Sequence, residues 1–558
     1  MVFEKNSELF KLQKEIERLK KSIKKQRYGL VWMDIPEAFE DDVENKLPIL
    51  KEVPELAIKN EDGKPQHILI EGDNYHALTC LNYTHKGKID VIYIDPPYNT
   101  GSDGFRYKDK RIIDKFPDGT EVPKDHPFRH SYWLSFMRKR LELARDLLKE
   151  DGCIFISIDE NEIGQIKLLC DELFSENNCH GILTWIKRTK PTNMGKARFK
   201  LQQNVEYILM YSKCTSEQHP GFILEEGKNK EYPDKGKHGK CRFEPMERRN
   251  VGTMIRDTMI YELLGVRPRN GYRWQISKKE ADRLLSENKI ELVDGKPNIA
   301  VYPEDEDNIS YVPFWSHLLD IGTAENGKAE LSSILGYEHH FDTVKPLHLI
   351  IKILKQFKQN SIVLDFFAGS GTTGHAVLEL NNKKNNLQFI ICTDNENNIC
   401  SEICYPRIKK VMRGYRDQKN NEVKGLGNSL KYYKTAFIGE NNILNANDED
   451  KVELAHNAGE LLAIAENTLE SVKQTKYYQL FEDNLKEKYT AIYFREELDQ
   501  FDKFVQIVEK LNKKTAVYVF SWGQDEFIEE FENLKNINVK TIPVPILEIY
   551  KNIYNLGN

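Results

Sequence analysis

The sequence IDVIYIDPPYNTG, from Ile89 to Gly101, decides the fold that we expect for the whole chain. Its apolar first half predicts a buried β-strand. Pro96 and Pro97 cannot continue a central strand, because proline has no N–H to donate and its φ is fixed near about −65°. The chain should therefore leave the sheet as a stiff loop at the carboxyl end of the strand, where open α/β sheets bind their ligands.

This loop carries groups that can hold a planar base by its exocyclic amine. Asp95 and the Pro96 carbonyl can accept the amine hydrogens, and Tyr98 can stack on the ring. A simple proline turn, in which Asp95 caps a neighbouring element, is the structural alternative. The complete Asp-Pro-Pro-Tyr directly after an apolar strand is more specific than such a turn. It resembles the catalytic tetrapeptide of amino-group DNA methyltransferases, which use S-adenosylmethionine, and this resemblance makes Asp95, Pro96, Pro97 and Tyr98 candidate catalytic residues.

The composition sets limits on the class of protein. A chain of 558 residues is too long for one core. We find no signal peptide and no apolar run near the roughly 20 residues of a membrane span, so no membrane association is expected. The net charge of −6 means that any nucleic-acid surface must be local.

The nine cysteines are scattered, without a paired C-x-x-C spacing. Cys392, Cys400 and Cys404 form the closest group, but no histidine accompanies them at metal-ligand spacing. We therefore expect buried free thiols, no metal site and a reducing, cytoplasmic setting.

Apolar strands alternate with amphipathic helices through the first part of the chain. We expect strands at 67–70, 88–94, 153–158, 181–186 and 206–211, and helices at 75–81, 130–149 and 163–174. This alternation predicts a doubly wound α/β sheet. Asp73, which follows the first of these strands, is interpreted either as a ligand-binding acid or as a simple helix N-cap.

The N-terminal segment predicts a helix from about Ser7 to Gln26. Its leucines and isoleucines are spaced alternately by three and four residues, as in a coiled-coil seam. Self-association and packing onto the chain's own body are equally compatible with this pattern.

Residues 187–289 hold 23 lysines and arginines against 13 acidic residues, an excess of ten positive charges in a chain that is negative overall. The basic residues are interleaved with aromatic ones, among them Tyr272 and Trp274. Such a region can neutralise phosphates and present side chains to base edges. A solvated basic face on an ordinary insertion is the alternative.

A second chemical centre lies at Ser361–Leu380, SIVLDFFAGSGTTGHAVLEL. A short strand leads into a glycine turn, and a helix begins near Thr372, whose N-terminus suits an anionic group. About twenty residues further on, Asp394 ends another strand, where it could accept ribose hydroxyls. Gly369, Gly371 and Gly374 also satisfy G-x-G-x-x-G, so a nicotinamide-dependent oxidoreductase is an alternative for this block alone. Such an enzyme has no use for Asp-Pro-Pro-Tyr on a partner strand.

The order of these blocks, with F-x-x-x-K-P at Phe341–Pro346 before the glycine turn, is similar to the β-class of DNA amino-methyltransferases. The segments GLVWMDIPEAF and HILIEGDNYHAL resemble the modification subunit of type III restriction-modification systems. This resemblance implies a circularly permuted Rossmann-like, S-adenosylmethionine-dependent methyltransferase that flips adenine out of double-stranded DNA and methylates N6. It also implies a homodimer and an ATP-dependent restriction (nuclease-helicase) partner subunit.

The same resemblance implies a set of cofactor-binding residues and a domain plan. The cofactor residues are Asp73, Lys345, Asp365, Phe367, Ala368, Gly369, Gly371, Thr372, Thr373 and Asp394, with Lys345 near the methionine end and Asp394 on the ribose. The plan is an N-terminal helix and connector (1–45), a catalytic part (46–212), an inserted target-recognition domain (213–335), a cofactor-binding part (336–437) and a C-terminal α/β domain (440–558).

The C-terminal region holds 13 basic against 22 acidic residues, which argues against contact with DNA. We expect a helix at 452–472, strands at 490–494, 515–520 and 539–542, and a protein-docking role; a stabilising appendage is the alternative. The chain shows no P-loop, helicase or nuclease motif. An orphan methyltransferase, cytosine N4 as acceptor and a non-catalytic DNA specificity subunit remain as alternatives.

Overall fold

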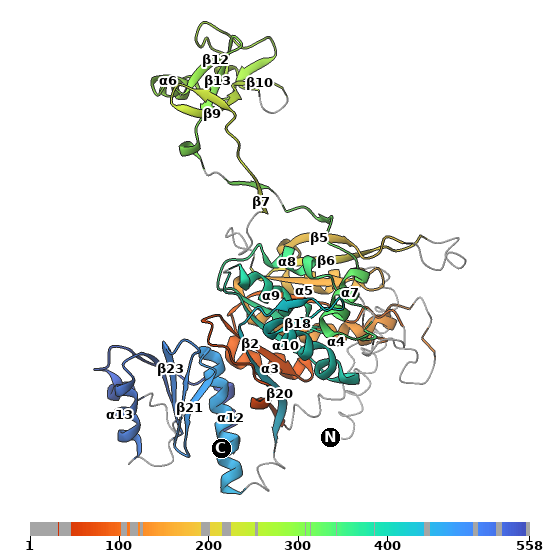
Figure 1. The fold of residues 1–558 in the computed structure, drawn as a ribbon, viewed down its shortest axis with the longest axis vertical. Coiled ribbons are helices and arrows are strands. Elements are labelled where there is room, and N and C mark those ends of the chain that lie inside the picture. Colours follow the sequence, from red (N-terminus) through yellow and green to blue (C-terminus); the bar gives the residue numbers. More distant parts are fainter. Residues whose placement is uncertain are drawn as a thin grey trace, which may run out of the picture. The chain divides into compact units, whose positions relative to one another are not determined.

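The computed structural model describes residues 32, 46–101, 109–111, 121–122, 126–190, 201–214, 225–251, 255–306, 309–312, 314–341, 343–383, 385–439, 447–494, 500–520 and 527–553. The helix expected at residues 7–26 lies outside this set. The chain divides into two compact units, one formed by Met1–Ile223 with Trp315–Asn558 and the other by Leu224–Phe314 (Figure 1).

The first unit is built on a sheet that has ten strands among the described residues. In spatial order they are β1 (Lys46–Glu52), β20 (Ser429–Gly439), β2 (Gln66–Glu71), β17 (Gln388–Thr393), β16 (Ile362–Asp365), β3 (Ile89–Ile94), β4 (Leu148–Ile158), β6 (Val205–Ser212), β5 (Cys179–Ile186) and β15 (His317–Leu318). The six strands from β20 to β4 are parallel, and β6 runs antiparallel to both of its neighbours. This arrangement confirms the predicted α/β fold.

The two motif blocks lie on adjacent parallel strands. Val363 of β16 is opposite Val91 of β3, so the glycine turn and the Asp-Pro-Pro-Tyr loop leave the sheet at the same edge. In the usual dinucleotide-binding fold the glycine turn follows the first strand. Here β3 precedes β16 in the chain, which is the permuted order that the motifs implied.

Helices cover both faces of the sheet. α3 (Asn74–His85), α4 (Ser131–Leu147) and α5 (Ile163–Phe174) share one apolar core with Leu364 and Ile390. α9 (Thr372–Asn382) packs against α8 (Leu347–Leu354) and α10 (Tyr405–Arg413) on the other face. There Gly374 lies so close to Ile391, Phe389 and Ile408 that a Cβ atom would contact their side chains.

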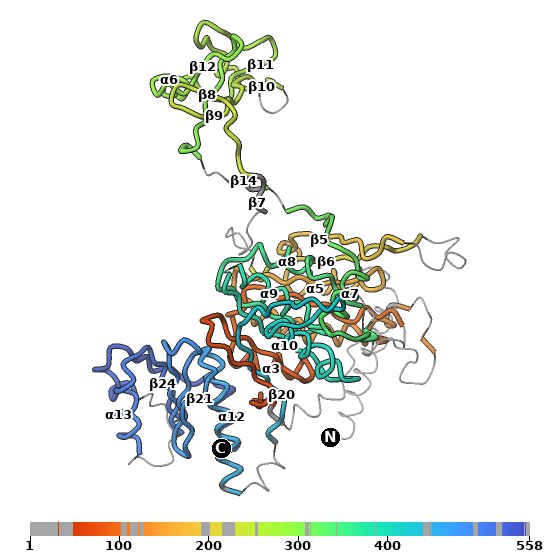
Figure 2. Tube along the Cα trace, in the orientation of Figure 1, coloured from red at the N-terminus to blue at the C-terminus, as the bar shows by residue number. Residues whose placement is uncertain are grey.

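Local sequence signals place most of these elements within a few residues. The helix expected at 163–174 has those bounds, and Asp73 is the N-cap of α3, accepting a hydrogen bond from the Tyr75 N–H at 2.7 Å. The helix expected at 130–149 ends earlier, at Leu147, because Leu148 already pairs with Ile89 of β3. Figure 2 traces the chain through the helices of this unit, among them α3, α5 and α10.

The second unit contains small antiparallel sheets. They are β12–β13–β9–β8 (Ile290–Val293, Lys296–Val301, Gly239–Pro245, Asp234–Gly236), β10–β11 (Glu247–Arg249, Tyr272–Trp274) and β14–β7 (Ile309–Val312, Glu225–Asn229). One nine-residue helix, α6 (Lys278–Ser286), packs into a core around Trp274, which is 2% exposed. Trp274, expected among the residues of a basic binding face, is therefore a core residue, and Tyr272 beside Arg269 is the more accessible aromatic.

The C-terminal elements form a second sheet, β21–β22–β23–β24–β25 (Glu470–Gln474, Tyr478–Glu482, Lys488–Tyr493, Lys514–Val519, Ile537–Val539), with α12 (Asp448–Glu466), α13 (Phe501–Leu511) and α14 (Val544–Ile553). The helix expected at 452–472 was placed too far along the chain, since Glu470 to Gln474 form a strand after the left-handed Asn467. β21 and β22 were not predicted.

These C-terminal elements share a core with the methyltransferase-like sheet, although we expected a separate domain. Leu461 and Leu462 of α12 belong to the same apolar cluster as Leu78 of α3 and Ile49 of β1. Glu470 also accepts hydrogen bonds from Lys59 and Gln66, each at 2.6 Å. The apolar face of α12 thus explains why the two parts form one compact unit.

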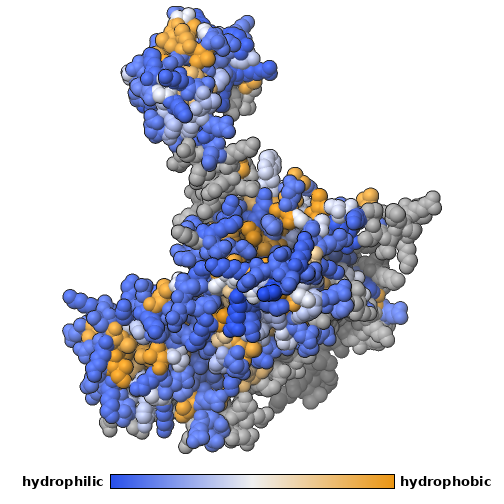
Figure 3. All heavy atoms as spheres, viewed as in Figure 1, coloured by the Kyte–Doolittle hydropathy of each residue, from blue (hydrophilic) through white to orange (hydrophobic). Residues whose placement is uncertain are grey.

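All nine cysteines are free, and Cys392, Cys400 and Cys404 are buried, as predicted. No helix among the described residues has the length and apolar character needed to cross a bilayer. The visible surface is mostly polar, with groups of apolar side chains over the C-terminal elements, over the second unit and over part of the first unit's main body (Figure 3). Val472 and Val544 are exposed apolar residues of the C-terminal elements.

Candidate active site

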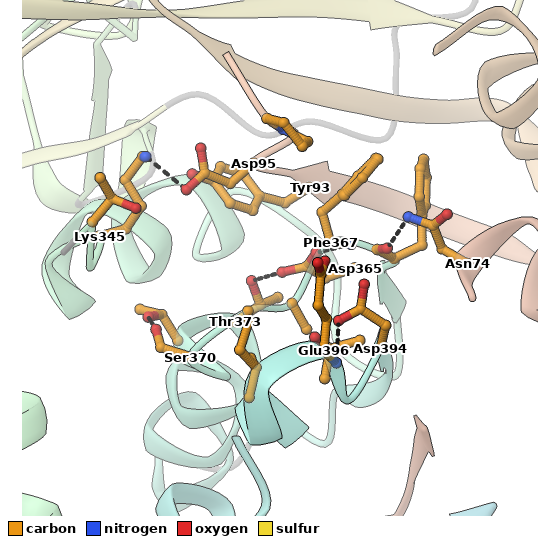
Figure 4. A pocket seen from close by; sticks show the side chains of 18 of the residues that line it. Asn74, Tyr93, Asp95, Lys345, Asp365, Phe367, Ser370, Thr373, Asp394 and Glu396 are labelled. Atoms are coloured by element: carbon orange, nitrogen blue, oxygen red, sulfur yellow. Dashed lines mark hydrogen bonds and ion pairs between the residues drawn. The ribbon is translucent and has the colours of Figure 1, made fainter. Parts of the chain in front are cut away.

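A cavity opens where β3 and β16 end, and both motif blocks contribute to its wall (Figure 4). Its lining combines carboxylates, aromatic rings and the glycine turn. The residues are Asp73, Asn74, Tyr93, Asp95, Pro97, Arg111, Phe136, Phe341, Thr343, Lys345, Asp365, Phe366, Phe367, Ala368, Gly369, Ser370, Thr372, Thr373, Thr393, Asp394, Glu396 and Ile399. We call it the first cavity.

The glycine turn is held in shape by Asp365. Its Oδ2 accepts a hydrogen bond from the Thr373 hydroxyl at 2.5 Å, and its Oδ1 accepts one from the Phe367 N–H at 3.0 Å. Gly369 and Gly371 have φ of 47° and 74°, a left-handed conformation that glycine adopts without strain. Burial raises the pKa of Asp365 to about 7, against the lowering effect of these two hydrogen bonds.

Two acidic residues that follow β2 and β17, Asp73 and Asp394, also line the first cavity. Asp73 caps α3 and also lies 3.5 Å from Arg140, so its capping role and a role in the cavity coexist. Asn74 donates to the Phe366 carbonyl at 2.9 Å, which ties α3 to the glycine turn. Asp394 is exposed and accepts a hydrogen bond from the Glu396 N–H at 3.1 Å.

The Asp-Pro-Pro-Tyr loop contains a compact charged cluster. Asp95 accepts the Tyr98 hydroxyl at 2.6 Å on Oδ1 and the Lys345 ammonium at 2.7 Å on Oδ2. Burial lowers the pKa of Lys345, but the carboxylates of Asp95 and Glu206 outweigh it, so the pKa lies above its usual value. Lys345 therefore binds the catalytic candidate Asp95 directly, a contact that the sequence did not reveal.

A second cavity lies on the other side of this loop. It is lined by Asp95, Pro96, Tyr98, Thr100, Asp109, Asp159, Glu160, Asn161, Trp185, Lys187, Arg188, Lys190, Glu206, Ala324, Glu325, Lys328, Thr343, Val344 and Lys345. Asp95, Thr343 and Lys345 line both cavities. Asp95 thus lies at the boundary between the first and the second cavity.

The loop is fixed by hydrogen bonds to its backbone and side chains. The indole N–H of Trp133 donates to the Pro97 carbonyl at 2.7 Å. Asn99, with a left-handed φ of 59°, donates to the buried Glu162 at 2.6 Å. Asp109 accepts the Tyr98 N–H at 3.1 Å. These contacts hold the candidate catalytic groups in place.

The sequence-predicted residues gather here with one exception. Gly371 does not line the first cavity; its N–H donates to the Ala368 carbonyl at 2.7 Å and it precedes α9 as the N-cap. Sequence reasoning missed Asn74, Phe136 and Arg111 in the first cavity and Glu206 in the second cavity. Glu206 is a lone acid at the start of an apolar strand and Arg111 lies in a polar loop, and neither position carries a sequence motif.

The solved structures that match this chain have low sequence identity to it. The PvuII cytosine-N4-specific DNA methyltransferase matches 62% of this chain and 90% of its own at 12% identity, with a TM-score of 0.33. A complex of M1.HpyAVI with SAM matches 62% of this chain and 98% of its own at 16% identity, with a TM-score of 0.29.

Relatives in sequence are closer. The Mod subunit of the StyLTI type III restriction-modification enzyme of Salmonella typhimurium is 32% identical over 451 residues, which are 73% of this chain and 66% of that subunit. The EcoP15I Mod subunit of Escherichia coli is 32% identical over 60% of this chain and 59% of its own length. The match thus spans less than two thirds of these Mod subunits.

Two further matches decide the family. The type II methyltransferase M.KpnI of Klebsiella pneumoniae is 31% identical over 56% of this chain and 76% of its own length. The model of the N6/N4 DNA methylase family matches residues 89–405, more than half of the chain, and spans both motif blocks. The chain therefore belongs to the family of N6/N4 DNA methylases.

Proposed function

We propose that this protein transfers a methyl group from S-adenosylmethionine to adenine N6 within a short sequence of double-stranded DNA. We propose further that it is the modification and specificity subunit of a type III restriction-modification system. The proposal rests on the position of Asp95, which lines both cavities. A methyltransferase must bring its methyl donor and its acceptor into contact, and Asp95 lies where a donor in one cavity and an acceptor in the other would meet.

The residues of the first cavity fit S-adenosylmethionine. A sulfonium and an ammonium group call for carboxylates, an amino-acid carboxylate suits a helix N-terminus, and ribose hydroxyls call for an acid. Asp365, the first turn of α9 and Asp394 would supply these groups, and Phe367 and Ile399 would supply apolar contact for the base. When bound, the cofactor supplies an electrophilic methyl group.

Tyr98, Pro96 and Asp95 would hold the acceptor base in the second cavity. Adenine N6 is a poor nucleophile because its lone pair is delocalised into the ring, and in duplex DNA it is stacked among neighbouring bases. Stacking on Tyr98 would offset part of the few kcal/mol that flipping costs. The amine would donate to Asp95 and to the Pro96 carbonyl.

These hydrogen bonds explain how the loop would accelerate the reaction. They draw electron density onto the amine nitrogen and localise its lone pair. They also strengthen as positive charge develops on that nitrogen, so they favour the transition state over the ground state. Lys345 donates a hydrogen bond to the Asp95 carboxylate and so holds that carboxylate in position.

The second unit, Leu224–Phe314, is the proposed target-recognition element. Arg248, Arg256 and Arg267 are exposed there and form no ion pair among the described residues, so their charge is available to phosphates or base edges. By contrast, Arg269 and Arg242 are engaged by Glu247 and Glu306.

The type III assignment follows from the Mod subunits that this chain resembles. It predicts a homodimer, a separate ATP-dependent nuclease-helicase partner and a cytoplasmic setting. The C-terminal elements, with their acidic excess and exposed apolar side chains, are the proposed docking site for that partner.

Incubation of the purified chain with methyl-labelled S-adenosylmethionine and genomic DNA tests the proposal. We expect label in N6-methyladenine, at one short motif. Label in N4-methylcytosine would overturn the choice of acceptor. No label with DNA, while the chain still binds DNA specifically, would favour a non-catalytic specificity subunit.

A further inference from the structure

Glu206 lies beside the catalytic candidates, although no sequence motif contains it. It is on β6, whose neighbour β4 separates it from β3 in the sheet, and it is 7% exposed. Its Oε2 is 3.2 Å from the Lys345 ammonium and 3.3 Å from the Tyr98 hydroxyl. Its Oε1 is 3.5 Å from the Lys187 ammonium.

The cluster holds two positive charges, on Lys345 and Lys187, and two negative charges, on Asp95 and Glu206. The distances between them differ. Lys345 is closer to Asp95, at 2.7 Å, than to Glu206, and it also donates to the Tyr98 hydroxyl at 2.9 Å. The Tyr98 hydroxyl has one hydrogen, and the shorter distance assigns it to Asp95. Glu206 therefore serves as a second anchor for Lys345.

This second anchor matters because Asp95 must remain available. A carboxylate has about four acceptor positions, of which Lys345 and Tyr98 use two here. A buried ammonium with Asp95 as its sole carboxylate partner would pair with it more tightly, since Coulomb attraction is strong where water is excluded. That pairing would compete with an incoming amine for Asp95.

We propose that Glu206 is a positioning residue for methyl transfer. It shares the Lys345 ammonium with Asp95 and keeps both the ammonium and the Tyr98 hydroxyl at fixed places, so that two acceptor positions of Asp95 stay open to the amine. This inference rests on the proposed function. Glu206 acts through the Lys345 ammonium, which it contacts and which in turn donates to the Tyr98 hydroxyl.

A double-mutant cycle tests this role. Single-turnover methyl transfer at saturating DNA is measured for the wild-type chain, Glu206→Gln, Lys345→Met and the double variant. We expect Glu206→Gln to slow the wild-type background on the order of 10- to 100-fold, because small displacements of reacting groups cost that much. In the Lys345→Met background the same change should cause no further loss, because the group through which Glu206 acts is absent.

Two further variants separate positioning from general damage. Glu206→Asp restores the charge and should recover part of the rate, and it also keeps the test valid if Glu206→Gln does not fold. Glu172→Gln removes a carboxylate that is paired with Arg138 on the outer surface of α5 and should leave the rate within about twofold. Titration of S-adenosylmethionine should give the same affinity for all Glu206 variants.

The outcomes distinguish this inference from the function on which it rests. A wild-type chain that methylates no DNA would overturn both. An active wild type with an equally fast Glu206→Gln variant, or with losses that multiply in the double variant, would overturn the positioning role alone.

Discussion

The ammonium of Lys345 donates to the carboxylate of Asp95 at 2.7 Å, across 250 residues of sequence. Asp95 directly follows β3, and Lys345 directly precedes the last residue before α8. The second unit lies between them in the sequence. β3 lies next to β16, the strand that follows α8 in the chain, so the two sequence blocks meet in one sheet. The proposed catalytic group and its cationic partner thus come from separate sequence blocks.

Tyr98 contributes both a ring and a hydroxyl, and two substitutions separate them. Tyr98→Ala should weaken base capture and methyl transfer by roughly 1 to 3 kcal/mol of lost stacking. Tyr98→Phe keeps the ring and loses the 2.6 Å contact to Asp95, so it should slow the reaction while leaving the affinity for DNA nearly unchanged. Fluorescence of 2-aminopurine at the target position reports base flipping beside the rate. Equal flipping by the alanine and phenylalanine variants would contradict the stacking role.

Cofactor affinity should depend on pH through Asp365. Burial raises its pKa to about 7 in the free protein. A cationic cofactor favours the ionised form, so affinity should be highest above that value and fall as the carboxyl is protonated. We expect a loss of roughly threefold to tenfold for each pH unit below about pH 7. Calorimetric titration of the cofactor between about pH 5.5 and 8 measures this dependence of affinity on pH.

The matched control for this pH dependence is Asp365→Asn. It should bind the cofactor weakly at every pH, with a flat profile over the same range. A wild-type affinity that does not change with pH would show that Asp365 is not the acid that faces the cofactor's positive charge.

Trp133 should matter for activity although it lies outside both cavities. Its indole N–H donates to the Pro97 carbonyl in a fully buried position. Trp133→Phe leaves that carbonyl without this donor and should cost about 1 to 3 kcal/mol of stability. Urea unfolding measures the loss, and the methyl-transfer rate measured well below the transition reports the loosened loop. A variant as stable and as fast as the wild type would show that this bond is dispensable.

The main residues of this site could be predicted because they lie in local sequence motifs. A strand followed by Asp-Pro-Pro-Tyr or by a glycine turn restricts its own backbone, so Asp95 and Asp365 were identified before any tertiary structure. Glu206 and Arg111 could not be found this way, since a lone acid in a strand or a lone arginine in a loop has no local signature. Their contacts arise from the order of the strands in the sheet.

The same limit explains the C-terminal part. A helix at 452–472 was predicted, but the sequence of a helix does not show which surface its apolar residues cover. The structure shows that α12 packs on α3 and β1. The short strands β21 and β22 follow Asn467, whose left-handed conformation ends the helix, and side-chain pattern alone did not reveal this stop.

Sequence specificity should move with the second unit. Exchange of residues 224–314 for the corresponding segment of a methylase with another target should change the methylated motif and leave cofactor affinity intact, because both cavities belong to the first unit. Sequencing of DNA with detection of modified adenine reads the result. A hybrid that still marks the original motif would refute the assignment of recognition to this unit.

In the proposed mechanism, Asp95 activates the acceptor amine and does not hold the cofactor. Single-turnover methylation by Asp95→Ala, beside calorimetric titration of S-adenosylmethionine, tests it most directly. Loss of a preorganised electrostatic partner should slow methyl transfer on the order of 100-fold or more, while the affinity for the cofactor stays near that of the wild type. An Asp95→Ala protein that methylates DNA at a near-normal single-turnover rate would contradict the account.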